Sequence, residues 1–191
     1  MSDTNSNSGF IPIHGGYRNL ITYQKAEIIY DGTVFFCNKF LNNYDRTIGQ
    51  MVQAARSGKQ NISEGSMASA TSKETEIKLT NVARASLDEL KNDFQDYLRT
   101  HKLKIWNRDD RLSVRFDELN KDPNANYETF KKAIEHDNPE ISANVLLCLT
   151  RLTIFLLGKQ LTALEKAFIN EGGLRERMLK ARLQNRNKST K

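Results

Sequence analysis

Apolar residues recur at helical spacing in two neighbouring segments that together span residues 46–98. In the first segment, intervals of three, four and seven residues place the apolar side chains on one face of a 3.6-residue helix. The second segment keeps the same period for about five turns. The apolar positions are Ile48, Met51, Val52, Ala55 and Ile62, then Leu79, Val82, Ala83, Leu87, Leu90, Phe94, Tyr97 and Leu98. This pattern predicts long helices over 46–64 and 72–100.

The connection between these helices is short, so they are expected to lie antiparallel as a helical hairpin. Gly65 is expected to end the first helix, because glycine readily adopts the left-handed conformation found there. Thr71 or Ser72 can accept a hydrogen bond from a free amide of the next helix, and Thr71 with Glu74 has capping-box spacing.

Two further long helices are predicted over 17–43 and 139–170, the second starting with a favourable proline at position 139. Between Val145 and Leu157 the last helix is apolar on nearly all sides. Either a neighbouring subunit or the polar segment 101–138 must therefore cover its outer face. That segment is expected to hold two short helices, over 109–120 and 127–136.

These elements predict an all-α chain folded as an antiparallel up-and-down four-helix bundle, with a helical insertion between helices 3 and 4. We expect a flexible N-terminal arm at 1–16 and the bundle at 17–170, with the insertion at 101–138. A basic C-terminal tail follows at 171–191, in which 174–184 forms a short helix. With only three prolines and ten glycines in 191 residues, the composition also favours helices.

The hairpin sequence resembles a known family. Residues 54–65 read AARSGKQNISEG, residues 71–74 read TSKE and residues 82–90 read VARASLDEL. This combination resembles the four-helix-bundle proteins encoded in 23S rRNA intervening sequences. GGY at 15–17 and EGGLRER at 171–177 resemble its longer "four helix bundle suffix" branch. The family includes the accessory variability protein of diversity-generating retroelements. The resemblance implies a homo-oligomer, with a pentamer as the first expectation, and a reverse transcriptase as a partner. It implies no catalytic residues.

The sequence offers no pattern typical of an enzyme. None of His14, His101 and His136 has a second ligand at the spacing that a metal site on one helix requires. The chain also lacks a G-x-S-x-G motif, a phosphate-binding P-loop and a G-x-G-x-x-G motif. We therefore predict no catalytic residues, no metal and no cofactor.

The start of the chain and its cysteines favour a cytoplasmic location. Residues 1–9 are polar and lack the basic and hydrophobic regions of a targeting peptide. Cys37 and Cys148 lie in apolar helical surroundings and are expected to be reduced. The apolar run Val145–Leu157 is too short to span a bilayer, so no membrane segment is predicted.

Positive charge gathers at the C-terminal end. The net charge is +6, and residues 171–191 hold seven Lys or Arg against two Glu, which leaves +1 for the rest of the chain. With cations of the hairpin, this tail predicts a surface that binds the backbone of RNA or DNA. No aromatic residues are interleaved for base stacking. The candidate residues are Arg46, Arg56, Lys59, Lys73, Lys78 and Arg84 of the hairpin, expected in one patch, and Arg175, Arg177, Lys180 and Arg182 of the tail.

Two other functions fit the sequence. A protein-interaction scaffold would use the apolar surplus of the first and last helices, and its positive charge would be incidental. An enzyme or small-molecule binder using the bundle interior is the weakest alternative, because no chemical motif supports it.

Overall fold

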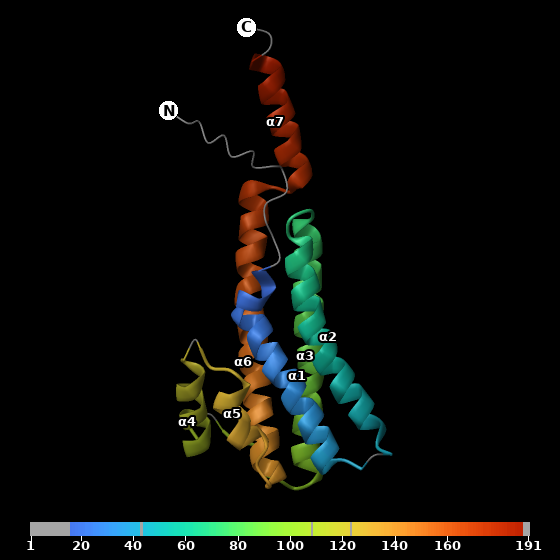
Figure 1. The fold of residues 1–191 in the computed structure, drawn as a ribbon, viewed down its shortest axis with the longest axis vertical. Helices are drawn as coiled ribbons and strands as arrows, with labels where there is room; N and C mark the ends of the chain where they lie inside the picture. Colours follow the sequence, from blue (N-terminus) through green and yellow to red (C-terminus); the bar gives the residue numbers. More distant parts are fainter. Residues whose placement is uncertain (1–15, 43, 108, 123, 189–191) are drawn as a thin grey trace.

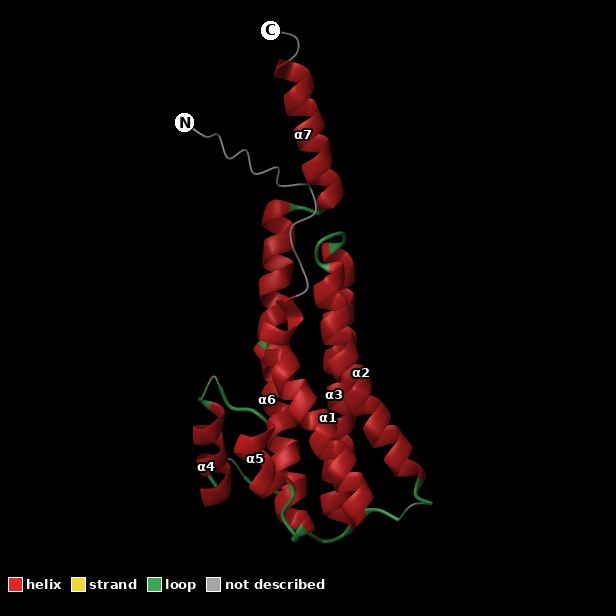
Figure 2. Ribbon diagram, viewed as in Figure 1, coloured by secondary structure: helices red, strands yellow, loops and turns green. Residues whose placement is uncertain are grey.

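The structure is a computed structural model that describes residues 16–42, 44–107, 109–122 and 124–188. The side chains of residues 177, 184, 185, 187 and 188 are outside that description. The described residues form seven α-helices and no strand (Figure 2). The predicted all-α class is therefore confirmed. The expected arm at 1–16 lies outside the described residues apart from Gly16.

The helical hairpin consists of α2, Arg46–Ala68, and α3, Lys73–Thr100. α2 continues one turn beyond the expected end, so the prediction that Gly65 ends this helix is wrong. Gly65 is instead buried inside the helix, where an added Cβ would lie 3.3 Å from Cβ of Leu79. Its missing side chain allows α3 to approach, and Ser72 alone caps α3 by accepting a hydrogen bond from the Thr75 amide at 3.1 Å.

The hairpin seam is close-packed at its centre. Gly58 of α2 faces Leu87 of α3, and an added Cβ at Gly58 would lie 2.7 Å from Cδ2 of Leu87. Leu87 and Leu90 are fully buried, as are Met51 and Ala55. These residues of the apolar stripe lie on the buried face of the pair, whereas the prediction that Val82 belongs to it is wrong, because Val82 is 46% exposed.

Two more long helices complete the main body. α1 spans Ile21–Phe40 and is preceded by a short 3-10 turn at Gly16–Asn19. The helix expected from residue 17 starts only at Ile21, because the backbone of Leu20 is extended. α6 spans Pro139–Glu171. α1 packs against α2 and α6, and α3 packs against α2 and α6, so each of the four helices touches two others (Figure 1).

The insertion carries two short helices, α4 at Arg111–Asn120 and α5 at Tyr127–Ile134. α4 and α5 pack against α6, and α5 also touches α1. Val145, Leu146 and Leu147 of α6 are at most 1% exposed, so the insertion covers the side of α6 that needed a cover. Farther along the same helix Phe155 remains 59% exposed.

A buried lysine of α1 lies beneath the insertion. Lys25 is 1% exposed, and its Nζ donates to Oδ1 of Asn120 at 3.1 Å, at the last residue of α4. The same Nζ lies 4.9 Å from the ring centre of Phe130 in α5. Burial lowers the pKa of Lys25 below its ordinary value, against the opposite effect of Asp122.

The tail is helical over a longer range than expected. α7 runs from Leu174 to Lys188 and follows Gly172, whose φ of 70° is a backbone conformation that favours glycine. Gly173 donates its amide to Oε2 of Glu176 at 2.6 Å, which caps the start of the helix. α7 makes no extensive contact with another described helix and continues beyond the hairpin tip (Figure 1).

One segment, Pro139–Glu176, is long and apolar enough to cross a membrane by length and composition. It exceeds the run Val145–Leu157 on which the sequence-based prediction was made. More than half of its most apolar window is buried inside the protein, a feature shared with core helices.

Candidate nucleic-acid interface

The hairpin cations occupy several sides of α2 and α3. Arg46 is the first residue of α2 and is exposed, as are Arg56 on the same helix and Lys78 and Arg84 on α3. Lys59 and Lys73 are partly buried.

Lys59 faces α1. Its Nζ lies 4.3 Å from the ring centre of Tyr30, a distance at which the ring attracts the ammonium. Asp31 is next to this contact: burial raises the pKa of its carboxyl, and the charge of Lys59 opposes that rise. The ammonium of Lys59 therefore interacts with groups of its own chain, which weakens its attraction for an external phosphate.

Arg84 lies on the other side of the hairpin. Together with Ala85, Asp88 and Ile154 it lines a cavity of about 420 Å³ at the seam between α3 and α6. The contacts among the four long helices place this seam opposite the α1–α2 seam that holds Lys59. The structure does not bring Lys59 and Arg84 into the single patch expected from the sequence.

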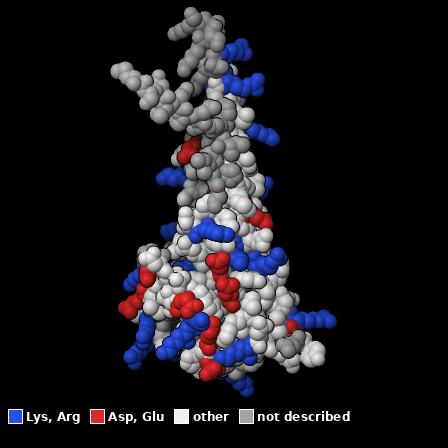
Figure 3. Space-filling view, in the orientation of Figure 1, with Lys and Arg blue, Asp and Glu red and all other residues white. Residues whose placement is uncertain are grey.

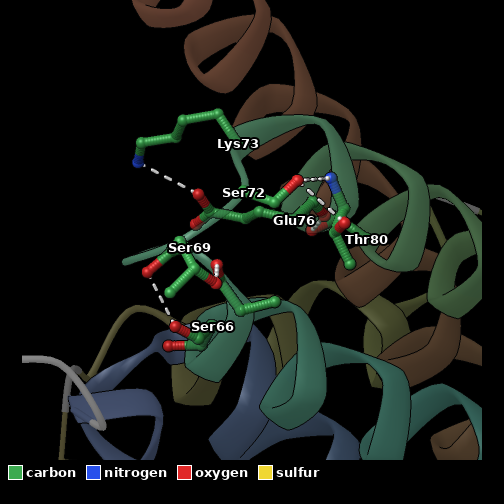
Figure 4. A network of polar contacts seen from close by, with 9 residues as sticks. Ser66, Ser69, Ser72, Lys73, Glu76 and Thr80 are labelled. Atoms are coloured by element: carbon green, nitrogen blue, oxygen red, sulfur yellow. Dashed lines mark hydrogen bonds and ion pairs between the residues drawn. The ribbon is translucent and has the colours of Figure 1, made fainter. Parts of the chain in front are cut away.

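Lys73 is the first residue of α3, at the hairpin tip (Figure 4). Its Nζ is 3.0 Å from Oε2 of Glu76, whose side chain is mostly buried. Lys73 also lines a cavity of about 450 Å³ with Ser72, Arg175 and Glu176. One hairpin cation and one tail cation are thus close together at this end of the molecule.

The outer seam of the hairpin is polar and partly acidic. Ser57 and Ser86 share a hydrogen bond of 2.9 Å across it. Glu89 and Asp93 line the adjoining cavity, and burial followed by repulsion from Asp96 and Glu89 raises the pKa of Asp93. Arg56 lies farther along α2 beside uncharged side chains and Glu64. Glu89 and Asp93 were not considered in the prediction of a basic patch, and these carboxylates reduce the attraction of this face for phosphate.

α7 presents the clearest concentration of positive charge. Arg175, Lys180 and Arg182 are exposed, while the side chain of Arg177 is outside the described part. The only acidic residue in the α7 sequence is Glu176, and its carboxylate accepts the hydrogen bond from Gly173. Lys and Arg side chains project from the upper extension of the molecule, where some acidic atoms are also visible, and both charge signs are mixed over the lower body (Figure 3).

The histidines take local contacts where they are described. The His101 ring stacks on Tyr97 at 4.1 Å, and His136 Nδ1 accepts a hydrogen bond from the Asn138 amide. His14 lies outside the described residues. Among the residues described, no group of three or more His, Cys, Asp or Glu side chains could hold a metal ion.

Both cysteines are free. Burial raises the pKa of the Cys37 thiol to about 12, so it is protonated and a poor nucleophile at neutral pH.

No protein-family model, curated protein or solved structure matches this chain.

Proposed function

We propose that this protein is a non-catalytic, homo-oligomeric accessory protein that binds RNA or DNA and assists a reverse transcriptase in the cytoplasm. The observation that carries the proposal is α7, where Arg175, Lys180 and Arg182 are exposed and the single carboxylate is occupied by a backbone amide. Phosphate binding adds over many cations, so a basic helix is effective even without base contacts. The resemblance to the intervening-sequence family supports the role as an accessory protein.

The proposed architecture is an up-and-down four-helix bundle of α1, α2, α3 and α6, with α4 and α5 inserted between its third and fourth helices. The contacts of each long helix with two others support this topology, as does the short α2–α3 connection.

Self-association would cover apolar surface that the insertion leaves open. Phe155 of α6 is 59% exposed and Val82 of α3 is 46% exposed. Symmetric closure is the usual way in which such surface is buried, and the family resemblance makes a pentamer the expected form. Light scattering at micromolar concentration should show a multiple of 21.9 kDa. A monomer would contradict this part of the proposal.

The exposed Phe155 and Val82 also favour a second candidate function, a protein-interaction scaffold without nucleic-acid binding. The two functions differ in a simple assay. Fluorescence anisotropy at about 50 mM salt, where counterion release favours association, should show binding of both RNA and DNA that falls steeply as salt is added. No binding at that salt concentration would leave the scaffold as the better explanation.

The contribution of the hairpin can be tested with Arg56→Gln, Lys59→Gln and Arg84→Gln together. Loss of three cations should weaken binding and flatten the salt dependence while the oligomer persists. Binding equal to that of the parent would show that these three side chains do not contact nucleic acid.

A further inference from the structure

α7 is a helix that lacks a packing surface within its own chain. It makes no extensive contact with another described helix, and Leu179 and Leu183 remain 57% and 50% exposed. A 15-residue helix is marginally stable in water on its own. A binding partner that contacts its sides would therefore stabilise it.

A second copy of α7 is a poor partner. The α7 sequence holds six Lys or Arg and one Glu, so pairing two such helices would bring like charges together. Charge complementarity requires a polyanion instead.

The described cations of α7 point to two sides. At about 100° per residue, Arg175 and Arg182 share one side of the helix, whereas Lys180 is about 140° or more away from both. Exposed Leu179 and Leu183 lie between these directions. Basic and apolar side chains are thus interleaved, unlike the segregated faces of a helix that lies on a membrane surface.

We infer that α7 inserts into the major groove of double-stranded DNA, with Arg175 and Arg182 reaching the phosphates of one strand and Lys180 those of the other. This inference rests on the proposed nucleic-acid binding and names its site and ligand class. The major groove of B-DNA is about 12 Å wide and admits an α-helix, and phosphates line both of its walls. Fifteen residues give a helix about 22 Å long, which the groove accommodates.

Other nucleic acids fit this helix less well. Single strands are usually bound by aromatic side chains on which bases stack, and residues 174–188 contain no aromatic residue. Double-stranded RNA has a deep and narrow major groove that an α-helix does not enter readily. In DNA, the exposed leucines would contact base edges and thymine methyl groups at the groove floor.

The test compares two triple variants of the full chain. The first is Arg175→Gln, Lys180→Gln and Arg182→Gln on α7. The control is Arg115→Gln, Lys121→Gln and Lys132→Gln, which removes the same charge from exposed positions on the insertion, at the other end of the molecule (Figure 1). The probes are a 20-base-pair DNA duplex, one of its strands alone and an RNA duplex of the same sequence, each measured by anisotropy across a salt series.

The α7 variant should bind the DNA duplex about tenfold or more weakly than the parent and lower the salt slope by about 3, whereas the control should stay close to the parent. The parent should prefer the DNA duplex to both other probes. Hydrogen exchange in 174–188 should slow when the DNA duplex is added.

Equal binding by the two triple variants would overturn the inference while leaving the proposed function intact, because nucleic acid would then bind elsewhere. Tighter binding of the single strand or the RNA duplex would also overturn it. If the parent binds none of the probes at about 50 mM salt, both the inference and the proposed function fail.

Discussion

The hairpin α2–α3 and the insertion α4–α5 are both helix pairs joined by a turn, yet they are held in place differently. The hairpin buries an unbroken apolar stripe, with Leu87 seated on Gly58 along a long seam. The insertion depends on a few large side chains, including Phe116 and Phe130, and covers the buried ammonium of Lys25. Extended periodic packing is expected to give a cooperative unit, whereas a docked pair with a buried cation is expected to open more easily.

The largest expected effect is in the hairpin. Leu87→Ala removes a fully buried side chain from the α2–α3 seam and should cost about 2–5 kcal/mol of unfolding free energy. Urea denaturation monitored by circular dichroism measures this loss. The control is Asn81→Ala on the same helix, where an exposed side chain predicts a much smaller change. A loss below about half a kcal/mol at Leu87 would show that the hairpin is not the cooperative unit.

Phe130→Ala should destabilise the insertion without destabilising the hairpin. Phe130 is 1% exposed and packs on Phe116, with ring centres 5.2 Å apart. A buried Phe→Ala change costs about 3–5 kcal/mol when the whole fold depends on the site, but here the loss is limited by the local stability of the insertion. Hydrogen exchange should become faster in 111–134 and stay unchanged in α2 and α3. Leu119→Ala, at an exposed site on α4, is the control. Equal loss of protection in the hairpin would mean that both regions unfold together.

At Lys25 a substitution is expected to stabilise the docked insertion, by less than the losses expected at Leu87 and Phe130. The folded protein lowers the pKa of this amine, so the docked insertion binds fewer protons than the undocked one. The penalty is complete below the lowered pKa and is relieved as pH rises toward the ordinary value of 10.5. Lys25→Met should stabilise docking by on the order of 1 kcal/mol and remove this pH dependence. Exchange rates in 111–134 between pH 7 and 10, corrected for intrinsic exchange, measure it, with exposed Lys78→Met as the control. Destabilisation by Lys25→Met would show that the amine contributes favourably to docking.

The same difference explains what the sequence could predict. In α2, α3 and α6, long apolar periods fixed the helices to within a few residues, because packing follows a repeating stripe. The end of α2 was missed because Gly65 reads equally as a helix terminus and as a site of close approach, and only the position of Leu79 decides between them. Whether Thr71 or Ser72 caps α3 depends on the local backbone conformation, which the spacing of apolar residues does not determine.

The candidate interface was less predictable because it depends on tertiary geometry. Lys59 and Arg84 lie on neighbouring helices, but α1 and α6 place them at opposite seams. The burial of Lys25 could not be read from spacing, because its cover comes from residues 95 and 105 positions farther along the chain. The basic character of the tail, by contrast, is a local property and was evident from composition.

The most direct test of nucleic-acid binding by α7 compares the salt dependence of the full chain with that of a chain ending at Gly172. α7 makes no extensive contact with another described helix, so its removal should leave the unfolding transition of the remaining helices unchanged. Each phosphate contact contributes about 0.9 to the slope of log binding constant against log salt on duplex DNA. The shortened chain should therefore show a slope smaller by about 3 or more and a correspondingly weaker affinity. An unchanged slope and affinity would contradict binding by α7 and would mean that nucleic acid binds to the rest of the protein.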